Sequence, residues 1–279
     1  MNTEKSAECA VCMHHCRLTE GQLGRCRARK NEEGRIVCAN YGKITGLMSD
    51  PIEKKPLRRF FPGSRILSVG SFGCNLSCPF CQNHEISMAG PEEFQPKEMT
   101  PENLAALAKF WEDDGNIGVA YTYNEPLVGY EFVRDTARLV RKLGMKNVLV
   151  TNGSASLWVL EELLPYIDAM NIDLKGFTEG YYRKLGGDLE TVKDFIRRAA
   201  QGCHVELTTL IVPGENDSEA RMEQEARWIA SISPEIPLHV TRFFPQYRME
   251  DRRATEVSVV YRLRDIAGKY LKYVYTGNC

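Results

Sequence analysis

The 279-residue sequence lacks any long apolar run, and its charges form no block of one sign. A helix that spans a bilayer needs about 20 apolar residues, and a secretory signal needs an apolar stretch near the N-terminus. The sequence shows neither, so we expect a cytoplasmic protein with no membrane partner. The formal net charge is −1, from 36 basic and 37 acidic residues, and this balance does not suggest a nucleic-acid partner.

Cysteine is scarce through most of the chain but crowded near its start. Eight of the ten cysteines precede residue 82, and only Cys203 and Cys279 follow. A small secreted domain would use such a density for disulfides, but here a long cysteine-poor region follows and no export signal is recognised. Clustered cysteines in a reducing compartment more often bind metal. We therefore expect metal chemistry in the first third of the chain.

The region from Arg65 onward alternates apolar runs with amphipathic helical patterns. The runs predict strands at 65–71, 117–123, 146–151, 169–175, 205–212 and 238–244. The helical patterns predict helices at 100–115, 126–144, 156–166, 190–202, 218–231 and 256–268. Strands that alternate with helices form parallel sheets through right-handed crossovers. We predict an α/β fold, a partial (β/α)6 TIM-like barrel, although an open doubly wound sheet would also fit.

The first 64 residues show no long helical period. We interpret residues 1–64 as a small cysteine-rich N-terminal appendage that binds metal, and residues 65–279 as the core domain. Short alternating runs within 35–50 predict a hairpin that turns around residues 40–42.

Four cysteines in this appendage bracket a glycine turn. They are Cys9, Cys12, Cys16 and Cys26. Four thiolates fit either a structural zinc ion or a second iron–sulfur cluster, and their spacing does not decide between the two. His14 or His15 could replace one cysteine. Because the segment has few apolar residues with which to fold otherwise, we expect a bound metal.

A second cysteine set, in a C-x3-C-x2-C loop, follows the first predicted strand. Its members are Cys74, Cys78 and Cys81. Three thiolates suit a 4Fe-4S cluster and leave one iron without a protein ligand, and that open position makes such a cluster catalytic. A structural zinc ion normally takes four ligands. Only His84 lies near enough to be considered as a fourth, so the spacing favours the cluster.

This loop, with Phe80 directly before its last cysteine, resembles the signature of radical S-adenosylmethionine (SAM) enzymes. The resemblance implies that SAM chelates the open iron and that its reductive cleavage gives methionine and a 5′-deoxyadenosyl radical. It also implies that Phe80 lies against the adenine, and that a low-potential flavodoxin or ferredoxin is the reductant. The protein would then supply orientation and exclude water.

Polar residues follow the later strands at their carboxyl ends, where ligands gather in such folds. The residues that we expect to contact SAM there are Asn124, Glu125, Thr151, Asn152, Asp173, Lys175, Val212 and Tyr247. Asn124 and Glu125 could accept hydrogen bonds from the SAM amino group, or could merely start the next helix. Asp173 and Lys175 share a strand face, and an ordinary salt bridge is the alternative. Tyr247 could equally lie on the surface, and His239 fits a satisfied core histidine.

Three further segments strengthen the resemblance. The N-terminal cysteines, with 50–64, 242–249 and 273–278, resemble the radical SAM member of the AmmeMemoRadiSam group, which is related to pyruvate formate-lyase activating enzyme. This implies a radical that abstracts hydrogen from a protein or small-molecule substrate, with glycyl-radical enzyme activation as the nearest named activity. The alternative is a zinc-stabilised, non-catalytic binding or scaffold protein in which both cysteine sets are structural.

Overall fold

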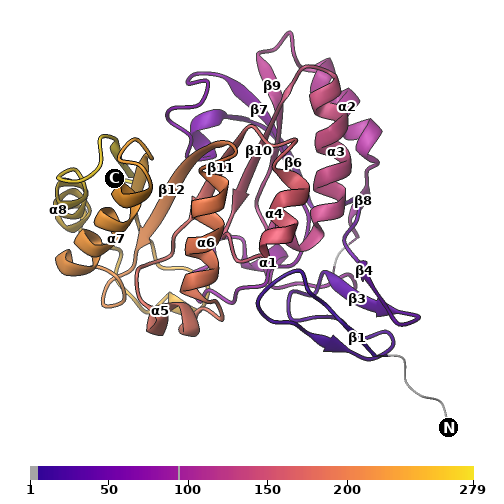
Figure 1. Cartoon of the computed structure of the whole chain (residues 1–279), viewed down its shortest axis with the longest axis horizontal. Helices are drawn as coiled ribbons and strands as arrows, with labels where there is room; N and C mark the ends of the chain where they lie inside the picture. The colour runs from indigo at the N-terminus through magenta and orange to yellow at the C-terminus, as the bar shows by residue number, and fades with distance from the viewer. Residues whose placement is uncertain (1–5, 94) are drawn as a thin grey trace.

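The computed structural model describes residues 6–93 and 95–279, and its main feature is an eight-stranded sheet with helices packed on it (Figure 1). The strands are β6 (Gly46–Pro51), β7 (Arg65–Gly70), β9 (Asn116–Tyr121), β10 (Lys146–Thr151), β11 (Ala169–Asp173), β12 (His204–Ile211), β13 (Leu238–Arg242) and β14 (Val274–Gly277). Their order is β14-β13-β12-β11-β10-β9-β7-β6, and all neighbours are parallel except β6, which runs antiparallel to β7. The six predicted strands are confirmed as β7 and β9 to β13, and β6 and β14 extend the sheet.

Six long helices connect the parallel strands, as predicted. They are α2 (Pro101–Phe110), α3 (Tyr130–Lys142), α4 (Leu157–Leu163), α6 (Leu189–Ala199), α7 (Glu219–Ile232) and α8 (Val257–Ala267). Thr100 caps α2 by accepting a hydrogen bond from the backbone N–H of Asn103. The largest differences from the predicted bounds are in α2, which ends before the turn at Gly115 (φ +83°), and in α3, which begins only after the 3-10 turn η2 (Pro126–Gly129). Among the residues that the structure describes, four short helical elements were not predicted: η1 (Ile52–Lys54), α1 (His84–Ser87), α5 (Glu179–Lys184) and η3 (Tyr247–Met249).

The N-terminal region forms small two-stranded sheets, and the predicted hairpin around residues 40–42 is wrong. The elements are β1 (Ala7–Glu8), β2 (Arg17–Leu18), β3 (Arg29–Glu32), β4 (Arg35–Cys38), β5 (Lys43–Ile44) and β8 (Lys97–Glu98). The hairpin joins β3 to β4 instead, and β5 pairs with the distant β8. Glu33 and Gly34 both have positive φ (54° and 80°), the conformation that a two-residue hairpin turn requires.

The segment between β6 and β7 closes one end of the curved sheet. Ile52 and Leu57 are fully buried, and Phe60 packs with them against Ile66 and Val148 in the first halves of their strands. This segment, with β6, therefore seals the amino ends of the parallel strands. The division predicted between residues 64 and 65 thus cuts across two hydrogen-bonded strands, β6 and β7.

Within the described residues, no helix combines the length and the apolar character that crossing a bilayer requires.

Candidate active site

A cavity of about 290 Å³ opens at the carboxyl ends of the parallel strands. The loop after β7, residues 122–125 after β9, the end of β10 and the end of β11 all contribute to its wall. Its lining includes these sequence-predicted residues: Cys74, Cys78, Phe80, Cys81, Asn124, Glu125, Thr151, Asn152, Asp173 and Lys175. The topology therefore brings together side chains that lie up to a hundred residues apart, at the end of the sheet where ligands bind in such folds.

The cysteine loop is held in shape by amide side chains. Asn124 accepts a hydrogen bond from the backbone N–H of Ser71 (2.9 Å), and its Nδ2 donates to the carbonyls of Phe72 (3.0 Å) and Gly73 (3.1 Å). Asn40 donates a further hydrogen bond to the Phe72 carbonyl (2.8 Å). The Asn124 amide is thus occupied by the backbone of the loop, a contact that the strand-end pattern did not reveal.

The three thiols of this loop lie in a setting suited to binding metal. Burial raises the pKa of Cys74, and raises that of Cys78 to about 11, so these two thiols keep their protons at neutral pH until a metal displaces them. Two N–H groups point at the Cys74 sulfur, the backbone N–H of Leu76 (3.4 Å) and Nδ2 of Asn152 (3.6 Å). Hydrogen bonds to sulfur of this kind tune iron–sulfur clusters. Three sulfur donors at one cavity wall fit a 4Fe-4S cluster.

Glu125 is buried at the end of β9, where its carboxylate joins two neighbouring strand ends. Oε1 accepts hydrogen bonds from the backbone N–H of Leu127 (3.0 Å) and the hydroxyl of Thr151 (2.7 Å), and Oε2 accepts one from the backbone N–H of Asn152 (2.7 Å). Burial raises the pKa of Glu125 to about 7, although these hydrogen bonds lower it. The carboxylate is thus a partly desolvated acceptor facing the cavity.

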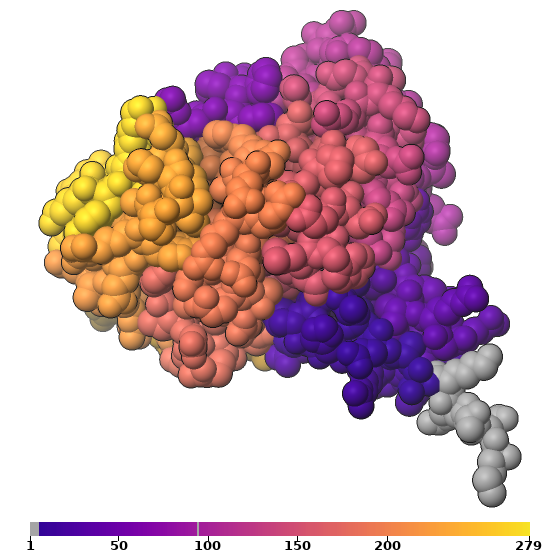
Figure 2. Space-filling view, viewed as in Figure 1, coloured from indigo at the N-terminus to yellow at the C-terminus, as the bar shows by residue number. Residues whose placement is uncertain are grey.

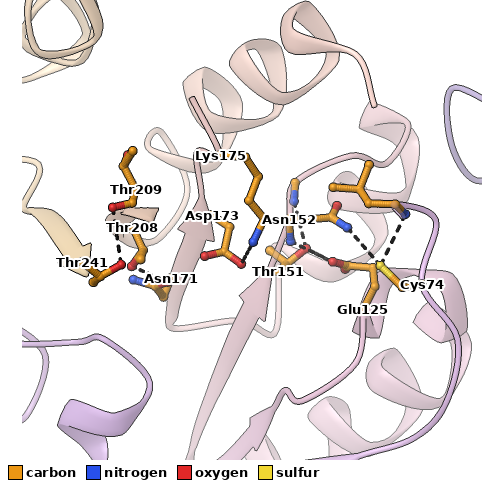
Figure 3. A network of polar contacts seen from close by, with 12 residues as sticks. Cys74, Glu125, Thr151, Asn152, Asn171, Asp173, Lys175, Thr208, Thr209 and Thr241 are labelled. Carbon is orange, nitrogen blue, oxygen red and sulfur yellow. Dashed lines mark hydrogen bonds and ion pairs between the residues drawn. The ribbon is translucent and has the colours of Figure 1, made fainter. Parts of the chain in front are cut away.

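Asp173 and Lys175 form a close ion pair at the end of β11, with 2.7 Å between Oδ2 and Nζ (Figure 3). Burial alone would lower the pKa of Lys175, but Asp173 and the nearby Cys78 and Cys81 thiols raise it, so the side chain is a cation. Both side chains line the cavity. The salt bridge expected as the alternative is therefore present, and it lies inside the cavity rather than on the surface.

A polar layer beneath this ion pair was not predicted. Thr208 donates to Oδ1 of Asn171 (3.0 Å), and Thr241 donates to the carbonyl of Thr209 (3.4 Å), as Figure 3 shows. Thr208 and Thr241 line the cavity, as does Asn278. Residues two apart on a strand share a face, so Asn171 lies below Asp173. The alternation of side chains along β11 was the available signal for this layer. It was not sufficient, because the sequence alone does not show which face of each strand points inward.

Comparison with known proteins identifies the family. Residues 68–226 match the model of the Radical SAM superfamily, which is more than half of the chain. The chain belongs to this superfamily. A 4Fe-4S cluster and SAM are accordingly its cofactors, SAM cleavage is its general reaction, and the prediction of an enzyme rather than a scaffold protein is confirmed.

Several individual proteins are similar to this radical SAM chain. The uncharacterized protein MJ0808 of Methanocaldococcus jannaschii is 38% identical over 278 residues, covering 99% of this chain and 82% of that protein. Pyruvate formate-lyase 1-activating enzyme of Escherichia coli K12 is 28% identical over 179 residues, covering 61% and 72%. Streptococcus suis SuiB, in a structure bound to S-adenosylmethionine, superposes with a TM-score of 0.60 at 14% identity, over 77% of this chain and 52% of that one. This last similarity shows the fold alone, and it agrees with the predicted partial barrel.

Two of the predicted SAM contacts lie behind the cysteine loop of this radical SAM chain instead of on the cavity wall. Val212 is fully buried in an apolar cluster with Phe80 and Phe243. Tyr247 stacks on His84, with ring centroids 4.3 Å apart and an interplanar angle of 18°. Val212 thus packs on residues of the loop, and Tyr247 packs on His84 just after it.

The predicted core histidine, His239, is confirmed. It is buried, and its Nε2 lies 2.6 Å from Oε2 of Glu206 on the neighbouring strand.

The four N-terminal cysteines also come together. Cys9, Cys12 and Cys26 are buried, Cys16 is half-buried, and none forms a disulfide. Burial raises the pKa of Cys12 and raises that of Cys26 to about 11, with smaller contributions from neighbouring thiols of the same set. Among residues 6–93 and 95–279, no three His, Cys, Asp or Glu side chains converge closely enough to hold a single metal ion. This holds both for the N-terminal cysteines and for Cys74, Cys78 and Cys81.

Proposed function

We propose that Cys74, Cys78 and Cys81 bind the catalytic 4Fe-4S cluster and that SAM binds in the adjoining cavity. The observation that carries this proposal is the cavity itself, which is lined both by the three free thiols and by polar side chains from three strand ends. When bound, the cluster would supply the electron that cleaves SAM to methionine and a 5′-deoxyadenosyl radical. The chain's own residues would bind and orient SAM and exclude water.

Glu125 has capacity for one more hydrogen bond. A carboxylate offers about four lone-pair sites, two on each oxygen. Leu127 and Thr151 donate to Oε1 and Asn152 donates to Oε2, so one site on Oε2 stays open toward the cavity. We assign this site to the SAM amino group, because a donor that carries positive charge would also offset the desolvation of the carboxylate.

The other cavity residues divide by chemistry. Lys175 is a cation on the cavity wall, so we assign it to an anionic group of SAM, with Asp173 holding its ammonium in place. Phe80 is an apolar side chain on the wall beside the cysteines, a position that suits the adenine ring. Thr151 and Asn152 orient Glu125 and the Cys74 sulfur. Asn124 acts as a positioning residue through the loop backbone.

The substrate and the reductant extend this proposal. Two relatives are named as activating enzymes of other enzymes, the E. coli protein above and the putative glycyl-radical enzyme activating enzyme MJ1227, which is 28% identical over 168 residues. Their names support hydrogen abstraction from a protein, or from a small molecule that enters over the polar layer of Thr208 and Thr241. We propose a low-potential flavodoxin or ferredoxin as the reductant, and the cytoplasm as the compartment, because buried free thiols persist in reducing surroundings.

Replacement of one cluster ligand tests the proposal. In anaerobically reconstituted protein supplied with dithionite and SAM, Cys78→Ala should lower 5′-deoxyadenosine formation by at least about a hundredfold, because loss of a ligand disrupts the cluster. The matched control is Cys203→Ala, a half-buried cysteine at the other end of the sheet, which should retain wild-type iron and product. Undiminished 5′-deoxyadenosine in Cys78→Ala would refute the ligand assignment.

A further inference from the structure

The two residues on either side of Cys74 both contact the N-terminal cysteine segment. Gly73 has a φ of +88°, and a Cβ at this position would collide with the backbone carbonyl oxygen of Cys26 and lie 2.9 Å from Cβ of Ala28. The main chains of the two cysteine segments therefore touch directly at this point. Only glycine permits so close an approach.

Asn75 makes the second contact. Its carbonyl lies 2.8 Å from Nε2 of His14, which stands between Cys12 and Cys16 in the chain. Its side-chain oxygen accepts a hydrogen bond from Nδ2 of Asn152 (2.9 Å), and that nitrogen is 3.6 Å from the Cys74 sulfur. A short polar chain thus leads from His14 through Asn75 and Asn152 to Cys74.

The N-terminal segment is fixed firmly enough to keep this geometry. The carbonyl of Ala10 accepts hydrogen bonds from the Ser156 hydroxyl (2.7 Å) and from Nε1 of Trp158 (3.0 Å), at the start of α4. Arg29, which is buried, pairs with Glu131 of α3 at 2.7 Å. Figure 2 shows the indigo part of the chain packed closely against the body of the molecule. The four-cysteine set is therefore held on the catalytic loop.

We propose that Cys9, Cys12, Cys16 and Cys26 bind a second iron–sulfur cluster that delivers electrons to the cluster at Cys74, Cys78 and Cys81. This inference rests on the function proposed above. A low-potential, one-electron donor protein reduces the N-terminal cluster by one electron. That cluster is reoxidised as it passes the electron to the catalytic cluster, which in turn passes it to SAM. No atom or proton moves in these transfers.

The position of the site favours an iron–sulfur cluster over zinc. Zinc has no redox chemistry, so at a zinc site the contacts on both sides of a catalytic cysteine would not serve electron transfer. Four cysteines complete the ligand set of a cluster that only carries electrons, whereas the three-cysteine set leaves an iron open for SAM. Arg25 and Arg27 flank Cys26, and Arg25 is exposed. This is the charge that an acidic electron-donor protein would contact.

Metal content gives the first test. Anaerobically reconstituted wild-type protein should contain about eight irons per chain, and the double variant Cys12→Ser/Cys26→Ser should contain about four. Cys38→Ser is the matched control, because Cys38 lies in the same appendage but donates a hydrogen bond to Oδ1 of Asn40 (3.0 Å). This variant should keep the wild-type iron content. About four irons with one zinc in the wild type, or an unchanged iron content in the double variant, would overturn the proposal.

Electron delivery gives the second test. We compare 5′-deoxyadenosine formed with reduced flavodoxin or ferredoxin against that formed with dithionite, a small reductant able to reach either cluster. In Cys12→Ser/Cys26→Ser, the ratio of protein-driven to dithionite-driven product should fall about tenfold. An unchanged ratio would overturn the relay. Failure of the catalytic assignment is distinguishable, because it would show as retained product in Cys78→Ala, whatever the metal at the N-terminal site.

Discussion

Two buried glutamates mark the two ends of the barrel, and their hydrogen-bond partners differ. Glu206, at the amino end of β12, lies 3.0 Å from Nε2 of His204 and 2.6 Å from Nε2 of His239. It also accepts hydrogen bonds from the backbone N–H groups of Arg58 (3.0 Å) and Arg59 (2.7 Å) in the closing segment. Burial opposes ionisation, but these donors outweigh it and lower the pKa of Glu206 to about 2.

Glu125, at the carboxyl end, accepts only from uncharged donors, two backbone N–H groups and one hydroxyl. Here burial dominates, and the pKa rises to about 7. The comparison separates stability from function. At the amino end, hydrogen bonds fully satisfy the buried charge of Glu206 and hold the closing segment in place. At the carboxyl end, Glu125 has a charge that only a cationic ligand would balance. Barrels of this type commonly divide their two ends in this way.

The largest effect is expected at the amino end. Glu206→Ala should lower the free energy of unfolding by about 3–5 kcal/mol, because it leaves two histidines and two backbone N–H groups without their acceptor. Urea unfolding of the full chain, followed by circular dichroism, measures this. Glu53→Ala is the control: Glu53 lies at the same end and accepts one N–H, from Gly63 (2.7 Å), near the surface. It should cost less than about 1 kcal/mol.

The hydrogen bonds to Glu206 also make the free energy of unfolding depend on pH. The folded pKa of Glu206 is lowered, so its contribution is fully present above the ordinary glutamate value of 4.5 and is lost as the pH falls toward about 2. Wild-type stability should therefore decline over that window more steeply than the stability of Glu206→Ala. Parallel acid profiles for the two proteins would contradict the assignment.

The amino end also shows where sequence reasoning stopped. His239 was correctly expected to be a satisfied core residue, but its partner Glu206 lies 33 residues away on another strand. The closing segment was assigned to the appendage because its apolar residues, Ile52 and Leu57, follow no helical or strand period. Their burial is explained by the curved sheet, whose interior they fill. Sequence patterns carry local periodicity, and these contacts depend on the closure of the sheet.

The catalytic end was more predictable, for a physical reason. Cysteine spacing and strand ends are local features, and parallel strands necessarily bring their carboxyl ends to one edge. This is why Cys74, Glu125 and Asp173 could be grouped correctly. What the sequence did not give was the orientation of each side chain. Two outcomes were therefore not foreseen: Val212 packs on the cysteine loop, and the Asn124 amide bonds to the backbone of that loop.

The next prediction concerns the catalytic end. Glu125→Gln should weaken SAM binding about tenfold, since the neutral amide cannot offset a cationic amino group, while iron content stays at the wild-type level. Equilibrium binding of SAM to the reconstituted protein measures the effect. Glu225→Gln is the matched control, because Glu225 is also a buried glutamate but lies on α7, outside the cavity. Equal SAM affinity in both variants would remove Glu125 from the binding site.

The smallest effect is expected at Glu225 itself, which tests whether an unmatched buried charge is costly where no ligand comes to balance it. Its carboxyl accepts a hydrogen bond from the Thr209 hydroxyl, and burial raises its pKa to about 8. A raised carboxyl pKa gives stability that is fully present below 4.5 and lost as the pH rises through about 8. Glu225→Gln removes this loss, so its advantage over wild type in urea unfolding should grow from pH 5 to pH 8 and reach about 1 kcal/mol or more. A constant difference across that range would mean that folding does not raise the pKa of Glu225.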